Sequence, residues 1–276
     1  MSFSQVVQQG DATELGLPDE SAALVFTSPP YNTNIVNKDE LAIYTADLLP
    51  WNEYEEIAYA AAEEMHRILV DHGRVFINIQ PTVPFDPSDK NDRRRMDLAG
   101  IWDDALVDAG FRYRDTIAWI QDSHDGACAW GSWARPSAPN FRGGWESIIV
   151  YYKDAEGGPG GSPDGWKRET PEQWKGWTDE RFGPGGDLTD CYRNVWKIQP
   201  ARSKYKATFP IELPYRAIRL STWPDDLVVD PFVGTGTTGI AAKHLLRPFY
   251  GVDKSESMAE LATTNIEEAE PYAAPE

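Results

Sequence analysis

A four-residue motif that follows an apolar segment, residues 22–27, carries groups suited to chemistry: Ser28-Pro29-Pro30-Tyr31. Consecutive prolines fix φ and remove backbone donors, so the loop beyond the expected strand is stiff. Such a loop can present Ser28 Oγ and the Pro29 carbonyl to the N–H groups of an exocyclic base amine, and Tyr31 as a ring that stacks on the base. The base would have to flip out of a duplex to reach them. A turn with a purely structural role is the alternative.

A glycine-rich segment near the C-terminus could bind a nucleotide-like cofactor. It reads Asp230-Pro231-Phe232-Val233-Gly234-Thr235-Gly236-Thr237-Thr238-Gly239, follows an apolar strand signal at 227–230 and opens a helix. Glycines let the backbone turn tightly and approach a ligand, and a helix N-terminus offers free N–H groups. Asp253, at the end of the next expected strand, is placed to accept hydrogen bonds from ribose hydroxyls. By itself this segment fits a dinucleotide as well as S-adenosylmethionine, or a turn made only for packing.

Alternating strand and helix signals surround the two motifs. Apolar runs predict strands that end near residue 10 and span 22–27, 74–80, 113–121, 147–152, 227–230 and 249–253. Periodic apolar positions predict helices over 53–70, 98–109, 237–245 and 256–269. This order predicts an α/β fold with a mostly parallel sheet and helices on both faces, whose ligands bind at the carboxyl ends of the strands.

The overall charge is strongly negative. With 26 Lys and Arg against 44 Asp and Glu, the formal net charge is −18, which conflicts with the phosphate neutralisation that supports DNA binding. Basic residues nevertheless concentrate in segments 193–219 and 90–95, which could face phosphates, although most charge runs are only solvated. An acidic surface stays soluble where salt screens its self-repulsion, so we expect a halophilic source, with an ordinary acidic protein as the alternative.

The two cysteines, Cys128 and Cys191, lie far apart and outside any ligand spacing, so we expect neither a disulfide framework nor a metal site. No apolar run approaches the ~18 residues of a membrane span, and no charged leader precedes an apolar stretch. We therefore expect a soluble, cytoplasmic protein.

The two motifs together resemble those of the amino-methylating DNA methyltransferases, which act on cytosine N4 or adenine N6. The catalytic motif of that family has the form (Asp/Asn/Ser)-Pro-Pro-(Tyr/Phe), and its place before the cofactor motif resembles the permuted order of the family's beta class. Further resemblance lies in residues 10–12, 130–133, 146–150 and 208–210. The resemblance implies a Rossmann-like methyltransferase fold with a seven-stranded sheet, and S-adenosyl-L-methionine as the cofactor.

The resemblance also implies roles for individual residues. Asp11 would end the strand beside the cofactor adenine, although it could be a plain turn acid. Phe232 and the glycine turn would cradle the methionine portion. The implied catalytic residues are Ser28, Pro29, Pro30 and Tyr31, and the implied cofactor-binding residues are Asp11, Thr208, Phe209, Pro210, Asp230, Pro231, Phe232, Gly234, Gly236, Thr237 and Asp253. Serine as the first catalytic residue resembles the N4-cytosine branch, with N6-adenine methylation as the alternative.

Three segments of the chain follow from the resemblance. Residues 1–153 would form the catalytic half, residues 154–205 a target-recognition insertion, and residues 206–276 the S-adenosylmethionine-binding half. DNA contacts are expected from Arg193, Lys197, Arg202, Lys204 and Lys206. The expected partners are double-stranded DNA and a cognate restriction endonuclease, and both a monomer and a homodimer remain open.

Rival functions can be compared with the same residues. A carbon-5 cytosine methyltransferase needs a cysteine nucleophile, usually after proline, whereas Cys128 follows alanine and Cys191 follows aspartate. A dinucleotide oxidoreductase would explain the glycine turn but not the Ser-Pro-Pro-Tyr loop. A non-catalytic DNA-binding protein with a retained fold, and methylation of RNA or protein amines, stay open.

Overall fold

One large sheet organises the part of the chain that the structure, a computed structural model, describes: residues 4–33, 48–89, 92–121, 144–154, 191–201, 208–223 and 225–269. Within these residues its strands lie in the order β1-β10-β9-β2-β3-β7-β6-β8. Their bounds are β1 (Gln5–Gln9), β2 (Ala22–Thr27), β3 (Leu69–Ile79), β6 (Phe111–Ile120), β7 (Trp145–Lys153), β8 (Val195–Lys197), β9 (Val228–Asp230) and β10 (Phe249–Asp253). The predicted strands are thereby confirmed, most of them within two residues of their expected ends, whereas β3 begins at Leu69, five residues before the expected start and inside the stretch predicted as helix.

The sheet is mostly parallel, as predicted. β7 runs antiparallel to both of its neighbours, β3 and β6, whereas every other pairing in the described sheet is parallel. Near the centre of the sheet, β2 lies between β9 and β3, with Val25 opposite Val229 on one side and Val75 on the other. The Ser-Pro-Pro-Tyr motif and the glycine-rich segment therefore leave adjacent strands at the same edge.

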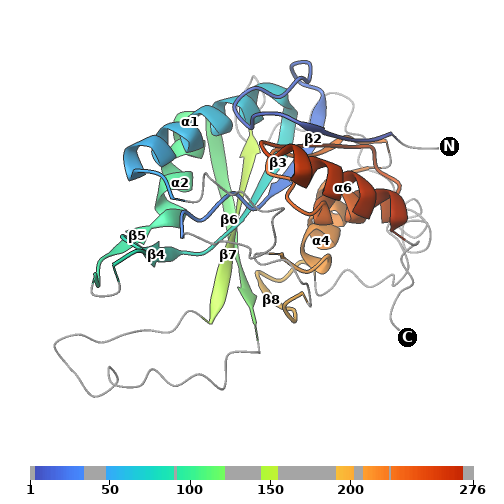
Figure 1. The fold of residues 1–276 in the computed structure, drawn as a ribbon. Helices are drawn as coiled ribbons and strands as arrows, with labels where there is room; N and C mark the ends of the chain where they lie inside the picture. Colours follow the sequence, from blue (N-terminus) through green and yellow to red (C-terminus); the bar gives the residue numbers. More distant parts are fainter. Residues whose placement is uncertain are drawn as a thin grey trace.

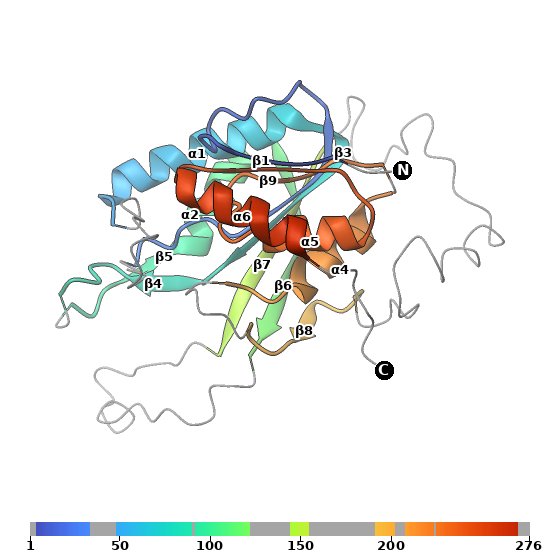
Figure 2. The ribbon, with the colours of Figure 1, turned by 45° about the vertical axis from the view of Figure 1, so that its right-hand side comes forward.

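Helices cover both faces of the sheet (Figures 1 and 2). The bounds are α1 (Trp51–Ile68), α2 (Leu98–Asp108), α4 (Glu212–Ser221), α5 (Thr237–His244) and α6 (Glu256–Glu268). Apolar side chains of α1 and α2 pack into one buried cluster against the sheet, and those of α4, α5 and α6 pack into a second cluster. The predicted covering of both faces is confirmed.

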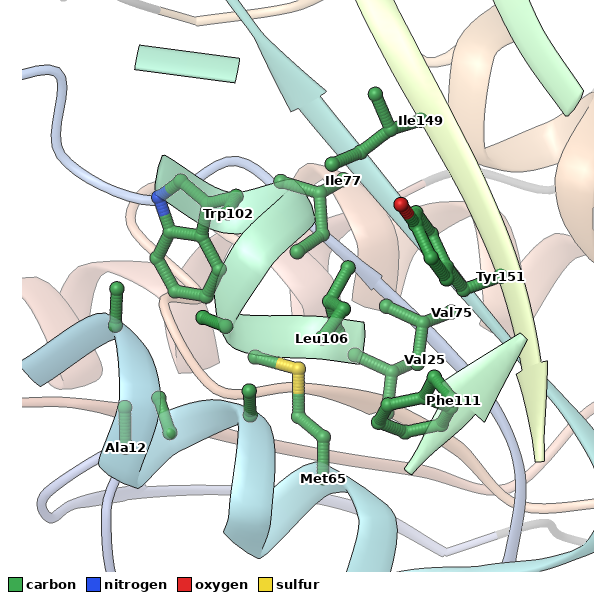
Figure 3. Close-up of a cluster of buried hydrophobic side chains, with 14 of the residues drawn as sticks. Ala12, Val25, Met65, Val75, Ile77, Trp102, Leu106, Phe111, Ile149 and Tyr151 are labelled. Carbon is green, nitrogen blue, oxygen red and sulfur yellow. The ribbon is translucent and has the colours of Figure 1, made fainter. Parts of the chain in front are cut away.

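Alternation along the strands separates these two clusters. In β2, Val25 points toward α1 and α2 while Leu24 and Phe26 belong to the opposite cluster, as the two-residue period of a strand requires. Figure 3 shows the first cluster, in which side chains of α1 and α2 meet those of the sheet: Ala12, Val25, Met65, Val75, Ile77, Trp102, Leu106, Phe111, Ile149 and Tyr151. Full burial of each large apolar side chain stabilises the fold by roughly 1.5–3 kcal/mol.

The described sheet has one strand more than the expected seven, because β8 joins it. β8 lies inside segment 154–205, and it pairs in parallel with β6 through Trp196 opposite Trp119. The Trp196 side chain is fully buried in the cluster beneath α4, so its apolar surface draws this short segment onto the sheet edge. Residues 155–190 and 202–207 of the expected insertion lie outside the described residues.

Three further elements were not predicted. A short hairpin of β4 (Thr82–Pro84) and β5 (Arg95–Asp97) follows β3. α4 was missed because Pro210 and Pro214 are poor helix signals. Pro214 nevertheless fits the first turn, where a backbone N–H would have no intrahelical partner in any case.

Gly239 provides a test of how closely α5 packs. A Cβ atom at this position would overlap Ile266 Cδ1 and lie 2.7 Å from Phe249 Cε1, so Gly239→Ala should lower the free energy of unfolding by about 1–3 kcal/mol through overpacking. Gly144→Ala is the matched control, because no atom lies within 4 Å of its added Cβ. Urea denaturation of both variants measures the difference. Equal stabilities would show that α5 and α6 are less closely packed than described.

Candidate functional site

One cavity of about 940 Å³ brings the two motifs together at the carboxyl ends of the parallel strands β10, β9, β2 and β3. Residues predicted from both motifs line it: Asp11, Ser28, Pro29, Pro30, Tyr31, Thr208, Phe209, Pro231, Phe232, Gly234, Thr237 and Asp253. This location is the one that open α/β sheets use for ligands. The cavity therefore has a glycine-turn side and a Ser-Pro-Pro-Tyr side that face one space.

Asp230 joins these two sides from behind the cavity wall. Its carboxylate accepts a hydrogen bond from Thr27 Oγ1 at 2.6 Å, from Thr238 Oγ1 at 2.6 Å and from the Phe232 N–H at 3.1 Å. The residue is 1% exposed, and burial raises the pKa of its carboxyl to about 6. Asp230 was expected to bind the cofactor, but it does not line the cavity; it holds the last residue of β2 against the start of α5.

The glycine turn has the backbone geometry that its sequence predicts. Gly234 and Gly236 have φ values of 50° and 87°, a region that glycine enters without steric cost. The Gly234 N–H donates to Asp253 Oδ2 at 3.1 Å, and Ser255 N–H donates to Asp253 Oδ1 at 2.9 Å. Burial raises the pKa of Asp253. Because an ionised carboxylate has about four acceptor sites, Asp253 keeps acceptor capacity for a ligand in the cavity.

Two more predicted cofactor residues, Gly236 and Pro210, are not part of the cavity lining. A Cβ at Gly236 would lie 3.0 Å from the backbone oxygen of Ala262, so the glycine is required by the close approach of α6. Pro210 lies two residues before α4, and its carbonyl accepts the Leu213 N–H at 3.1 Å. Both residues therefore shape the wall from behind.

The Tyr31 hydroxyl is the centre of a polar network on the other side of the cavity. It donates to Glu146 Oε2 at 2.9 Å and accepts from Asn78 Nδ2 at 3.0 Å, and Ser28 Oγ lies 3.2 Å away. Glu146 also accepts from Asn78 Nδ2 and from Gln121 Nε2, both at 2.9 Å. Burial, with the charge of Glu146, holds the pKa of Tyr31 well above its ordinary value. The hydroxyl therefore stays protonated and bridges Ser28 to a carboxylate.

Hydrogen bonds from α1 and α2 fix the rest of the Ser-Pro-Pro-Tyr loop. Tyr54 Oη donates to the Pro30 carbonyl at 2.7 Å, and Trp102 Nε1 donates to Tyr54 Oη at 3.0 Å. Asn32, at a φ of 57°, exchanges two bonds with the Leu49 backbone, at 2.9 and 2.7 Å. The Pro30 carbonyl is thus engaged by the protein, which leaves Ser28 Oγ and the Pro29 carbonyl as the predicted acceptors for a substrate.

Asp11 is a turn acid that also lines the cavity. It lines the cavity after β1, and its Oδ1 accepts from Thr13 N–H at 3.0 Å and from Thr13 Oγ1 at 2.8 Å, as a turn acid does. Lys254 Nζ lies 3.6 Å from Asp11 Oδ2. On the opposite wall, Phe209 packs edge-to-face on Phe26 with ring centres 5.6 Å apart.

The expected DNA-contacting residues divide into two groups. Arg193 and Lys197 are exposed beside and within β8. Arg202, Lys204 and Lys206 lie outside the described residues, as does Lys90 of the second basic segment.

Two basic side chains of segment 193–219, Arg216 and Arg219, do not extend into solvent. Arg216 forms an ion pair with Glu212 at 3.0 Å, and its guanidinium lies 5.4 Å from the Trp196 ring centre. Arg219 is 7% exposed and lies over the Tyr215 ring. The expectation that both face phosphates is wrong, because α4 turns them toward the protein.

Four residues of the site were not assigned a role from the sequence. Thr27 directly precedes the Ser28 motif, Thr238 lies within the glycine-rich segment, and both hold Asp230. Asn78 and Glu146 hold Tyr31. Asn78 carried a usable signal, since it is a polar residue inside an apolar strand. Glu146 was noted only within the resemblance of residues 146–150.

In the described ranges, no helix is both long and apolar enough to cross a membrane. Side chains of His, Cys, Asp and Glu do not gather there in groups of three or more that could hold a metal ion. Cys191 is buried, and Cys128 lies outside the described residues.

The sheet, the glycine turn that opens a helix and the acid at the end of the next strand define a Rossmann-like protein with a nucleotide-type pocket. The chain belongs to the N6/N4 DNA methylase family, whose sequence pattern matches residues 22–264.

Individual proteins with similar sequences or structures are also methyltransferases or DNA methylases by name. The type II methyltransferase M.BglII of Bacillus subtilis is 27% identical over 259 residues, which cover 90% of this chain and 64% of that protein. The chain thus spans somewhat less than two thirds of the length of this relative. The solved structure of TTHA0409 from Thermus thermophilus, assigned as a DNA modification methylase and complexed with S-adenosyl-L-methionine, has a TM-score of 0.71 and 25% identity, covering 97% of this chain and 96% of that one.

The PvuII DNA methyltransferase, which is cytosine-N4-specific, shares the fold. Its TM-score is 0.64 at 20% identity, with 95% of this chain and 86% of that chain covered. The predicted methyltransferase-type fold is confirmed by these structures.

Asp230→Asn tests the buried bridge through the pH dependence of stability. Because burial raises the pKa of Asp230 to about 6, the folded state favours the protonated carboxyl. The resulting stability, up to about 3 kcal/mol, is complete below the ordinary pKa of about 3.9 and is lost as the pH rises through 6. Asparagine does not titrate, so Asp230→Asn should not lose this stability. The free energy of unfolding of the native protein should therefore fall relative to that of Asp230→Asn between pH 5 and pH 8. Urea denaturation across this range measures the difference, and a constant difference would contradict the bridge as described.

Proposed function

We propose that the protein is a site-specific DNA methyltransferase that transfers a methyl group from S-adenosyl-L-methionine to the N4 amine of cytosine in double-stranded DNA. The observation that carries this proposal is the single cavity shared by the glycine turn and the Ser28 loop. The alternative function, a dinucleotide-dependent oxidoreductase, would give the Ser28 loop no role. Membership of the DNA methylase family supports the same choice.

The glycine-turn side suits S-adenosyl-L-methionine. Asp253 would accept the ribose hydroxyls, Phe232 and the turn would enclose the methionine portion, and Asp11 would lie beside the adenine. When bound, S-adenosyl-L-methionine supplies an electrophilic methyl group. The cavity of about 940 Å³ lies within the range of ligand pockets, roughly 300–1,000 Å³.

The Ser-Pro-Pro-Tyr side suits a flipped base. Ser28 Oγ and the Pro29 carbonyl would accept the two N–H bonds of the exocyclic amine and turn its lone pair toward the methyl group. The Tyr31 ring would lie against the base. We propose direct in-line transfer without a covalent enzyme intermediate, since this loop offers no cysteine nucleophile.

The choice of cytosine N4 rests on Ser28 as the first residue of the motif, where adenine enzymes more often carry aspartate or asparagine. Adenine N6 is the alternative outcome. We propose that segment 154–205 recognises the target sequence, with Arg193, Lys197, Arg202, Lys204 and Lys206 on phosphates or bases. A cognate restriction endonuclease would share that target.

Radiolabelled methyl transfer to unmethylated genomic DNA, followed by digestion to nucleosides, tests the function. We expect label in N4-methylcytosine, and Ser28→Ala should lower the rate by roughly 100-fold because one acceptor is lost. Label in N6-methyladenine would keep the enzyme class and change the base. Absence of label in DNA, with tight binding of NAD(H), would overturn the proposal.

We also propose that the protein works at high salt. Its formal net charge is −18, and α1 exposes Glu53, Glu55, Glu56 and Glu63 on one helix. Repulsion between such charges falls as salt shortens the screening length from about 10 Å at 0.1 M to about 3 Å at 1 M. The midpoint of thermal unfolding should therefore rise between 0.1 and 2 M NaCl. A maximum in dilute buffer would count against this proposal.

A further inference from the structure

Glu146 is a carboxylate in the cavity wall that neither sequence motif contains. It is the second residue of the antiparallel strand β7, so its side chain reaches the edge where the parallel strands end. It lies 115 positions from Tyr31 in the chain, yet its Oε2 accepts the Tyr31 hydroxyl at 2.9 Å. Its place in the fold thus brings a formal negative charge to the loop that would hold the base.

The hydrogen-bond directions around Tyr31 follow from which groups can donate. An ionised carboxylate can only accept, so the bond to Glu146 uses the one hydrogen of the Tyr31 hydroxyl. The competing acceptor, the Asn78 carbonyl, is farther away at 3.3 Å. The lone pairs of Tyr31 Oη then accept from Asn78 Nδ2 at 3.0 Å and from Ser28 Oγ at 3.2 Å.

The orientation of Asn78 depends on the same carboxylate. Its Nδ2 donates to Glu146 Oε2 at 2.9 Å, and the reversed amide would place an oxygen against that carboxylate. Asn78 is 1% exposed, so this orientation is held inside the protein. Both donors that face Glu146 Oε2 are therefore fixed in one direction.

We propose that Glu146 is a positioning residue that, through Tyr31, makes Ser28 a hydrogen-bond acceptor for the amine to be methylated. Once the Ser28 hydroxyl hydrogen points at Tyr31, the Ser28 Oγ lone pairs remain for an N–H of the substrate. A base with a carbonyl at the same position would meet an acceptor instead of a donor and would be disfavoured. This assignment rests on the proposed methyl transfer and adds a residue to it.

The hydrogen-bond chain from Ser28 through Tyr31 to Glu146 also gives a path for the proton that the product must lose. After transfer, the methylated nitrogen carries a positive charge and loses one proton to Ser28 Oγ. The former Ser28 hydrogen passes to Tyr31 Oη, and the Tyr31 hydrogen passes to Glu146 Oε2, which becomes a neutral carboxyl. Glu146 is half-exposed in the cavity wall and can then release this proton to water. The raised pKa of Tyr31 agrees with a hydroxyl that relays a proton and is never left as a phenolate.

A double-mutant cycle in single-turnover methyl transfer to DNA tests this hydrogen-bond chain. Glu146→Gln keeps the size of the side chain and removes its charge, and Tyr31→Phe keeps the ring and removes the hydroxyl. Each change should lower the rate by roughly 100-fold, within the range for proton transfer by a side chain. Because both act through one chain, the double variant should also lose roughly 100-fold, whereas independent effects would multiply to roughly 10,000-fold.

Controls separate positioning from folding. The dissociation constant for S-adenosyl-L-methionine and the midpoint of thermal unfolding should stay near the native values in Glu146→Gln, and Glu146→Asp should recover part of the lost rate. Glu63→Gln removes the same charge from the exposed side of α1 and should keep the native rate. If Glu146→Gln does not fold, Tyr31→Phe and Glu146→Asp still test the chain, since a native rate in Tyr31→Phe overturns it.

The outcomes distinguish the proposed role of Glu146 from the proposed methyltransferase activity on which it rests. A native rate in Glu146→Gln, or losses that multiply in the double variant, overturns the role of Glu146 and leaves the methyltransferase intact. Lack of transfer by the native protein overturns both.

Discussion

The site depends on the buried carboxylate of Asp230. It accepts bonds from Thr27 at the end of β2 and from Thr238 at the start of α5, residues that lie in different thirds of the chain. Since Ser28 follows Thr27 directly, any shift of this bridge would move the Ser-Pro-Pro-Tyr side of the cavity relative to the glycine-turn side. The proposed in-line transfer would require those two sides at a fixed separation.

The order of the motifs along the chain matters less than the order of the strands in the sheet. β2 and β9 are neighbours, with Leu24 opposite Val228, although the Ser-Pro-Pro-Tyr motif comes early in the sequence and the glycine turn late. Parallel pairing puts the carboxyl ends of both strands at one edge. A permuted chain can therefore build the same kind of cavity as long as the sheet keeps its strand order.

The antiparallel strand β7 adds what the parallel strands cannot. Its first residues, rather than its last, reach the cavity, so Glu146 can approach the Ser-Pro-Pro-Tyr loop from the side opposite α1. α1 and α2 meanwhile fix the loop through Tyr54 and Trp102. The loop is thus stiffened by its prolines and held by side chains from three other elements.

The sequence alone predicted the parts whose signal is local. The apolar run of β2, the glycine turn and Asp253 were expected where the structure has them, because strand periodicity and glycine geometry are properties of adjacent residues. The prediction was less accurate where a long-range contact decides the outcome. The helix α4 was not predicted because it contains Pro214. Arg219 was predicted to face solvent, but the packing of that helix buries it.

The sequence by itself determined the two motifs and the α/β class, since each follows from residue types and short spacings, and the resemblance to the methylase family implied that the motif order is permuted. Tertiary structure decided that Asp230 is a support behind the cavity wall, that Trp196 draws an eighth strand to the sheet, and that Glu146 faces Tyr31. The physical reason is that a side chain acquires its partners and its dielectric surroundings only when distant segments pack together. A composition or a motif carries no information on that packing.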